Sequence, residues 1–377
     1  MDVLEDEEEK DERDFTLSPP DISKEAFLAW RSPRLGTSNP TDQSNPLWEW
    51  LVRSKLDAYN ANERLNGPAS REAGAMWCFN RFGMSRTPLP DGRVVHIAGE
   101  HEDFYDPDFH IYNDVVVTHS NGDVQIYGYP KEVFPPTDFH TATLIDQRIV
   151  LIGNLGYPES RQPGVTSVLV LNLATFEMHS VPTHGESPGW ISRHTAEYIA
   201  EAGHIVVRGG EFCRDDDKPM RLNVDEWALD VTTWTWSRRT QLDWTQWWLI
   251  RKDRLRNNLW DLRQLAWYES VAWEKERDEQ RSKVIERIGS LPDLSLLDKL
   301  YQPWSGIELL PEEEDSYAVY RIRVDGIEVR LDEHDGFGIT ILIKGDLAES
   351  QRDALLQSML MDLQLLDGQP WEAMRME

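Results

Sequence analysis

Two stretches of this sequence nearly repeat each other: His140-Thr-Ala-Thr-Leu-Ile-Asp-Gln-Arg-Ile-Val-Leu-Ile-Gly153 and His194-Thr-Ala-Glu-Tyr-Ile-Ala-Glu-Ala-Gly-His-Ile-Val-Val-Arg-Gly209. A weaker copy lies upstream, Ser85-Arg-Thr-Pro-Leu-Pro-Asp-Gly-Arg-Val-Val-His-Ile-Ala-Gly99. The closing glycines are 54 and 56 residues apart. A self-similar period of this length indicates a chain made of repeated structural units.

Each unit predicts an antiparallel sheet of about four strands. The dipeptides Asp91-Gly92 and Asn121-Gly122 separate short apolar runs, and both are strong hairpin signals because glycine adopts positive φ without steric cost. A threonine followed by an aromatic residue recurs late in the unit, as Thr175-Phe176 and Thr233-Trp234. Units of about fifty residues with four short strands are typical of β-propeller blades.

The repeated residues resemble those of kelch repeats. The third unit has the double glycine Gly209-Gly210, the second has Gly153, and the first has Gly99. The run 77–109 is also similar to a group of uncharacterised bacterial kelch-like proteins. The resemblance covers about residues 77–240 and implies a propeller-like fold with a binding role, without implying a reaction. Kelch propellers close with more blades than these three, so strands elsewhere complete the ring, the ring stays open, or another chain closes it.

Composition narrows the partners that the chain can bind. The 377 residues include 67 acidic and 39 basic side chains, a formal net charge of −28, which disfavours nucleic acid and anionic membranes and favours a basic protein. The two cysteines, Cys78 and Cys213, exclude a disulfide framework and a cysteine-rich zinc site. We find neither an apolar signal region nor a membrane-length run, and expect a cytoplasmic protein.

We predict five regions. Residues 1–44 form an acidic disordered tail and linker, interrupted by a short helix over 24–31 that Ser23 caps. Residues 45–75 form a helix that begins at Asn45-Pro46 and packs on the following domain through Leu51, Val52, Leu56 and Tyr59. Residues 76–242 form the repeats, 243–310 a helical segment, and 311–377 a C-terminal α+β module. The expected fold class is mainly β with α+β additions.

The last two regions are predicted from their apolar spacing. Leu255, Leu259, Leu262, Ala266 and Trp273 form a helical stripe on a long helix from about Asp243 to Ile288. Nine of the sixteen tryptophans lie between Trp227 and Trp273, which suggests a seam between this helix and the propeller, or a sugar-binding platform. The C-terminal module predicts strands over 317–324, 327–331 and 337–343, followed by a helix with a capping box at Asp346 and Glu349.

The densest polar cluster is the loop Gly99-Glu-His-Glu-Asp-Phe-Tyr-Asp-Pro-Asp-Phe-His110. With the loops 128–139, 154–166 and 211–223, the loop 100–113 lies on one propeller face, where binding residues concentrate. The candidate binding residues are Glu100, His101, Glu102, Asp103, Tyr105, Asp106, Asp108, Tyr157 and Glu211. A metal set of His101, Asp103, Asp106 and His110 is an alternative, although its spacing matches no metal motif. The simpler interpretation is that these aspartates cap turns of their own loop.

Catalytic motifs are missing from the sequence. It has no Gly-x-Ser-x-Gly elbow and no phosphate-binding glycine loop with its lysine. Asp225 and Glu226 are adjacent on a strand and therefore point to opposite faces. Because His140 and His194 recur at equivalent positions, we assign them a structural role, and Gly209-Gly210 a close backbone approach.

These observations favour a non-enzymatic, cofactor-free scaffold for protein interaction. Its charge suits a basic partner such as a nuclease toxin, in which case the chain is the immunity protein. The alternative is a metal-dependent or carbohydrate-active enzyme on a propeller scaffold. A third hypothesis is a structural subunit that forms a homo-oligomer through exposed sheet edges.

Overall fold

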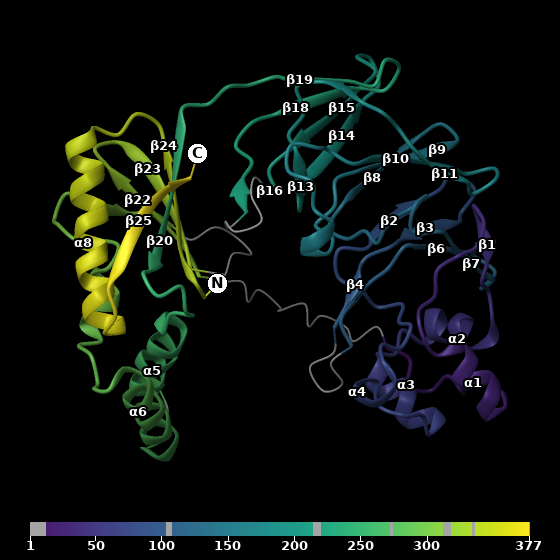
Figure 1. Cartoon of the computed structure of the whole chain (residues 1–377), viewed down its shortest axis with the longest axis horizontal. Helices are drawn as coiled ribbons and strands as arrows, with labels where there is room; N and C mark the ends of the chain where they lie inside the picture. The colour runs from purple at the N-terminus through teal and green to yellow at the C-terminus, as the bar shows by residue number, and fades with distance from the viewer. Residues whose placement is uncertain are drawn as a thin grey trace, which may run out of the picture. The chain divides into compact units, whose positions relative to one another are not determined.

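The computed structural model describes residues 13–102, 108–213, 220–271, 274–311, 318–333 and 336–376. It is mainly β, and the chain divides into two compact units, Met1–Gln241 and Leu242–Glu377. Figure 1 shows the elements of each unit. In the described ranges, no helix is long and apolar enough to cross a membrane.

In the described part of the first unit, three of the sheets each contain four antiparallel strands that follow one another in chain order. The first repeat has β2 (Ser85–Pro88), β3 (Val94–Ile97), β6 (Asp114–Thr118) and β7 (Val124–Gly128); the second has β8 (Thr141–Ile145), β9 (Arg148–Ile152), β10 (Val168–Asn172) and β11 (Met178–Ser180); the third has β14 (Thr195–Ile199), β15 (His204–Arg208), β18 (Trp227–Asp230) and β19 (Thr235–Arg238). The prediction of four strands per unit is confirmed. Within the described ranges, the sheets do not join into a closed barrel.

Strand register places the short and long connections at opposite ends of these sheets. Ser85 pairs with Ile97 and Asp114 with Gly128, so the 98–113 connection lies at the end where β2 begins. The equivalent connections 153–167 and 209–226 join β9 to β10 and β15 to β18. We call this the long-loop end. The opposite, hairpin end carries the turns 89–93, 119–123, 146–147, 173–177, 200–203 and 231–234, and the predicted turn glycines Gly92 and Gly122 have φ of 86° and 88°.

Adjacent sheets pack face to face, because alternate residues of one strand enter different cores. In β9, Ile149 and Leu151 join the cluster shared with the first repeat, whereas Val150 and Ile152 join the cluster shared with the third. Successive side chains of a strand point to opposite faces, so one middle sheet serves two cores. The apolar run 149–152 is therefore buried on both sides.

His140 and His194 connect each repeat to the one before it, which confirms their structural assignment. His140 Nε2 lies 2.9 Å from Ser85 Oγ, and His194 Nε2 lies 3.0 Å from Thr141 Oγ1. The preceding residues make a matching pair of backbone bonds: Phe139 N–H donates to Gly83 O at 3.0 Å, and Arg193 N–H to Phe139 O at 2.9 Å. Burial lowers the pKa of His140 to about 3 and that of His194 to about 4, so both imidazoles are neutral at pH 7.

The N-terminal helices pack on the first repeat. They are α1 (Lys24–Trp30), α2 (Pro46–Ser54), α3 (Ala58–Leu65) and α4 (Ser70–Ala73). Ser23 and Asn45 cap α1 and α2 as predicted, and Leu51, Val52 and Leu56 are buried in one cluster with Val116 and Ile126 of the sheet. The single helix expected over 45–75 is wrong: α2 ends at Ser54, Lys55 follows with a φ of 54°, and Asp57 caps a new helix that leaves Tyr59 exposed.

The disordered tail and linker predicted over 1–44 is wrong for its described part, 13–44. Strand β1 (Thr41–Asp42) pairs with β7, and Gly36 N–H donates to Tyr129 O at 3.0 Å. Near the start, Asp14 N–H donates to Ser54 O at 2.8 Å. Backbone bonds to the folded unit outweigh the polar composition of this segment.

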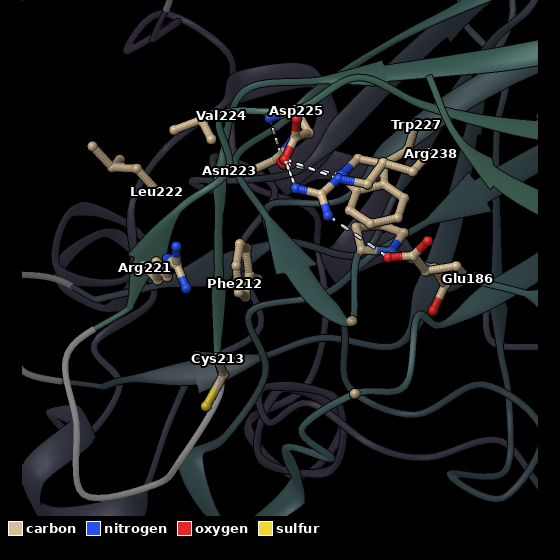
Figure 2. A pocket seen from close by; sticks show the side chains of 14 residues that line it. Glu186, Phe212, Cys213, Arg221, Leu222, Asn223, Val224, Asp225, Trp227 and Arg238 are labelled. Carbon is tan, nitrogen blue, oxygen red and sulfur yellow. Dashed lines mark hydrogen bonds and ion pairs between the residues drawn. The ribbon is translucent and has the colours of Figure 1, made fainter. Parts of the chain in front are cut away.

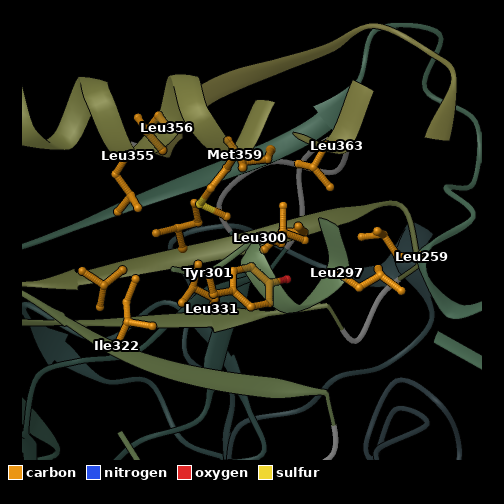
Figure 3. Packing of buried hydrophobic residues seen from close by; sticks show 14 of the residues in the cluster. Leu259, Leu297, Leu300, Tyr301, Ile322, Leu331, Leu355, Leu356, Met359 and Leu363 are labelled. Carbon is orange, nitrogen blue, oxygen red and sulfur yellow. The ribbon is translucent and has the colours of Figure 1, made fainter. Parts of the chain in front are cut away.

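Over its described residues, the second unit consists of a six-stranded antiparallel sheet and four helices. Strand order is β21 (Glu308–Leu309), β22 (Val319–Val324), β23 (Ile327–Asp332), β24 (Gly338–Lys344), β20 (Trp244–Arg251) and β25 (Trp371–Met376). The helices are α5 (Leu259–Val271), α6 (Glu274–Ile288), α7 (Ser295–Lys299) and α8 (Glu349–Asp367). Figure 3 shows Leu355, Met359 and Leu363 of α8 facing the sheet residues Ile322 and Leu331.

Several predictions for this part of the chain need correction. Residues 244–251 form a strand and not the start of a long helix, since their aromatic and β-branched residues pair with β24 and β25. Leu259 and Leu262 are buried in the second unit's own core, whereas Leu255 is exposed, and so is Trp267. The three strands and helix of the C-terminal module are confirmed, but the residue at the helix N-cap is Ala348, without a side-chain capping bond.

Candidate functional site

The long loops are bonded to one another across all three repeats. Gly99 N–H donates to Thr137 O at 2.8 Å, and Leu155 N–H donates to Asp138 O at 3.1 Å. Asn154 N–H then donates to Ile191 O at 2.9 Å, which reaches the third repeat. These bonds join loops that are far apart in sequence into a single layer. A partner that contacts this end would meet a preorganised surface.

Four charged side chains from three repeats form an acid–arginine cluster at this end: Glu100, Asp138, Arg193 and Glu211. Arg193 Nε lies 3.0 Å from a Glu211 carboxylate oxygen, and its guanidinium carbon lies 3.9 Å from the centre of the Phe139 ring. The aromatic face and the carboxylate therefore hold the arginine from different directions.

The two other carboxylates of the cluster have perturbed acidities. Burial raises the pKa of Glu100, the charges of Asp138 and Glu102 raise it further, and Arg193 opposes them. Burial also raises the pKa of Asp138, against a hydrogen bond of 2.7 Å from Gly156 N–H and the charge of Arg193. Clustered perturbed groups of this kind are enriched at functional sites. The cluster can accept hydrogen bonds from a cationic group that approaches the long-loop end.

The repeat glycines permit the close packing of this end. Gly153 has a φ of 79°, and a Cβ at this position would lie 2.4 Å from Ile191 O. Gly210 has a φ of 76°, and its Cβ would lie 2.4 Å from Ser192 O. The predicted close backbone approach at Gly209-Gly210 is confirmed at Gly210, because only glycine leaves room for the backbone of Ser192 and His194.

The candidate binding residues divide by exposure. Glu102 is exposed, while Glu100, Tyr157 and Glu211 are partly exposed. Tyr157 has a structural contact: its hydroxyl accepts a 2.9 Å hydrogen bond from Ile111 N–H and so links two of the long loops. Asp103, Tyr105 and Asp106 lie outside the described residues. His101 and Asp108 are 6% and 5% exposed, so their assignment as surface binding residues is wrong.

The proposed metal set is regrouped by the fold. His101 lies with Asp108 and Cys78, and one potential ligand atom from each lies within 4.8 Å of the other two. His110 is not in this group, and its ring instead packs edge-on against Tyr112 at 4.8 Å. His110 nevertheless lies opposite His101 in the β4–β5 pairing, and the two predicted aspartates lie outside the described residues, so the predicted set stays a prediction. Cys78 was missed, because it lies 23 residues upstream and only the fold brings it to the loop.

A cavity of about 240 Å³ lies in the third repeat. Its lining includes Phe212, Trp227 and Asp225, and Figure 2 shows Arg238 between Asp225 and Glu186. Arg238 Nε donates to Asp225 at 3.1 Å. The cavity was not anticipated, because its lining combines Gly164 with separate parts of the 181–240 segment.

The adjacent carboxylates of this region have separate partners. Asp225 bonds Arg238, and Glu226 bonds Arg208 Nε at 2.7 Å. The prediction placed both residues on a strand, but β18 begins only at Trp227, and it is their separate arginine partners that keep the two carboxylates apart.

Arg193 and Asp138 were also missed as site residues. Arg193 directly precedes His194 in the third repeat, and Phe139 directly precedes His140 in the second. Extending the aligned repeats two residues upstream would have placed Arg193 and Asp138 at the same end of neighbouring units. No family model matches this chain, and no curated protein matches it either.

Proposed function

We propose that this protein is a non-enzymatic scaffold that binds a basic protein partner at its long-loop end. In this proposal the three repeats are blades of an open, kelch-like β-propeller. The supporting observation is the common register of the repeats, which brings the connections 98–113, 153–167 and 209–226 to one end. Binding residues are commonly carried on long loops that a rigid scaffold positions.

The charge of the chain supports a cationic partner. A net charge of −28 steers basic proteins toward the molecule and repels nucleic acid. Exposed carboxylates from each repeat lie near the long-loop end, among them Glu102, Glu159 and Glu186. Inhibition of a basic toxin, with this chain as its immunity protein, is the specific form of the function that we propose.

The first test is affinity capture of the tagged protein from its own cells, read by mass spectrometry at low and physiological salt. We expect one stoichiometric basic protein that is retained less as salt rises, because surface electrostatic attraction is screened. Recovery of this chain alone would contradict the partner proposal and favour self-assembly.

Two matched triple variants locate the surface. Glu102, Glu159 and Glu186→Lys change one exposed acid near the long loops of each repeat, whereas Asp123, Glu177 and Glu201→Lys change one acid per repeat at the hairpin end. Both sets change the net charge equally. We expect the first set to reduce capture at least about tenfold and the second to change it little. Equal losses from both sets would indicate a general charge effect and contradict a long-loop site.

A further inference from the structure

We propose that Cys78, His101 and Asp108 form a binding site for a divalent transition-metal ion, with Zn²⁺ as the best fit. The three residues offer sulfur, nitrogen and oxygen donors that lie within 4.8 Å of one another. The inference rests on this cluster alone and does not depend on the proposed protein-binding function.

The spacing requires little movement for coordination. His101 Nε2 lies 3.6 Å from Asp108 Oδ1. With zinc bonds of about 2.0–2.1 Å to nitrogen and oxygen, two ligand atoms of a tetrahedral site are about 3.4 Å apart. That pair is therefore already near ligand separation, and the cysteine sulfur lies within the same group.

The orientation of His101 is the second, independent observation. His101 Nδ1 lies 2.9 Å from Asn80 O, and because a carbonyl can only accept, Nδ1 carries the proton. Nε2 then presents its lone pair on the side where Asp108 lies. Metal-binding histidines commonly donate their other ring N–H to a backbone carbonyl in this way, which fixes both tautomer and ring orientation.

The burial and charge of the three residues indicate which class of metal ion fits the site. Cys78, His101 and Asp108 are 0%, 6% and 5% exposed. A thiolate and a carboxylate together offset the double positive charge of the ion, which a buried site requires. The sulfur and imidazole donors favour zinc or a similar transition metal over calcium and magnesium, which prefer oxygen donors. Three protein ligands leave a fourth position for water.

A cysteine nucleophile activated by histidine and aspartate is the competing interpretation of these residue types. In such a triad, the histidine bonds the nucleophile through one ring nitrogen and the acid through the other. Here His101 Nδ1 bonds Asn80 O, and Cys78 is fully buried from an incoming substrate. The geometry therefore favours metal coordination.

The site would also fix a loop. His101 and Asp108 bracket the segment 102–107, and Cys78 belongs to the core that the N-terminal helices share with the first repeat. An ion bound by all three would cross-link both ends of the segment and tie them to that core.

The test is zinc binding by the full-length protein, measured by elemental analysis after zinc loading and extensive dialysis. We expect about one equivalent for the wild type. Cys78→Ser, His101→Gln and Asp108→Asn should each weaken zinc binding by at least about 100-fold, because even a lost outer-shell partner costs 10–100-fold. The controls are Cys213→Ser and His110→Gln, which should retain wild-type binding. Less than a tenth of an equivalent in the wild type, or wild-type affinity in folded Cys78→Ser, would overturn the proposal.

A second measurement avoids dependence on the folding of the Cys78 variant. The chain has two cysteines, so Cys213→Ser leaves Cys78 as its only thiol. Loading this protein with Co²⁺ should give a thiolate-to-cobalt charge-transfer band that Zn²⁺ abolishes. Lack of this band in the folded Cys213→Ser protein would contradict coordination by Cys78. Both readouts are independent of partner capture, so either proposal can fail without the other.

Discussion

The hairpin end and the long-loop end of the three repeats are built from the same strands but are stabilised differently. At the hairpin end, Gly122 and Gly203 have positive φ, and a Cβ would meet no atom within 4 Å. At the long-loop end, a Cβ on Gly153 or Gly210 would lie 2.4 Å from the backbone of a neighbouring segment. The conformation of the hairpin end therefore follows from the local preferences of its turn residues, whereas the conformation of the long-loop end depends on contacts between segments that are distant in sequence.

The largest difference between the two ends should come from a buried ion pair. Asp114, the first residue of β6, forms two hydrogen bonds with the guanidinium group of Arg81. Its carboxylate also accepts a 2.7 Å hydrogen bond from Trp77 Nε1, and its side chain is 6% exposed. Asp114→Ala leaves a buried arginine without its carboxylate and should lower the free energy of unfolding by about 3–5 kcal/mol. Urea unfolding checks this value. Exposed Asp123→Ala at the hairpin end should change it by less than about 0.5 kcal/mol, and similar losses in both variants would contradict the comparison.

A pair of glycine substitutions isolates the effect of close packing. Gly122→Ala should cost about 1–2 kcal/mol of unfolding free energy, because alanine disfavours positive φ. Gly153→Ala adds a clash with Ile191 O and should cost about 1–3 kcal/mol more. Thermal and urea unfolding of the two proteins measure the difference directly. An equal loss of unfolding free energy in the two variants would show that the backbone at the long-loop end can shift to accommodate the added methyl group.

Acid should weaken the contacts between repeats. The folded pKa values of His140 and His194, about 3 and about 4, lie below the ordinary value of 6.5. Between pH 6.5 and the folded pKa values, these histidines are protonated in the unfolded chain but stay neutral in the folded chain. Their contribution to the free energy of unfolding is therefore fully present above pH 6.5 and is lost as the pH falls. At pH 5 each histidine should account for about 2 kcal/mol of lost stability relative to pH 7.

The control for this effect is a histidine at the hairpin end. In His194→Gln, the difference in unfolding free energy between pH 7 and pH 5 should shrink by about 2 kcal/mol. His119→Gln, where the ring bonds Gln125 at the surface, should keep the wild-type difference. An unchanged difference in His194→Gln would contradict the exclusion of protons from the buried imidazole.

The features predicted correctly from sequence depend on local chemistry. Asp91-Gly92 and Asn121-Gly122 specify their turns through glycine φ alone, and the repetition of His140 and His194 indicated a structural role. Strand β20 was missed because its partner strands, β24 and β25, both lie far downstream in the sequence. No spacing rule links a cysteine to a histidine 23 residues away, so Cys78 was missed for a related reason.

The candidate site shows the same division. The sequence indicated the acidic loop with Glu100 and a second loop with Glu211, but it gave no sign that Arg193 lies beside Glu211. It also could not distinguish exposed Glu102 from buried Asp108, because alternation is not regular in the loop. Burial in a long loop is decided by which other loops cover it.

The central claim is that the long-loop end is the binding surface, and hydrogen–deuterium exchange of the captured complex tests it most directly. We predict that the partner slows exchange in 98–113, 153–167 and 209–226, while the hairpins 119–123, 173–177 and 200–203 exchange as in the free protein. Protection confined to the hairpins, with the long loops unchanged, would contradict the claim.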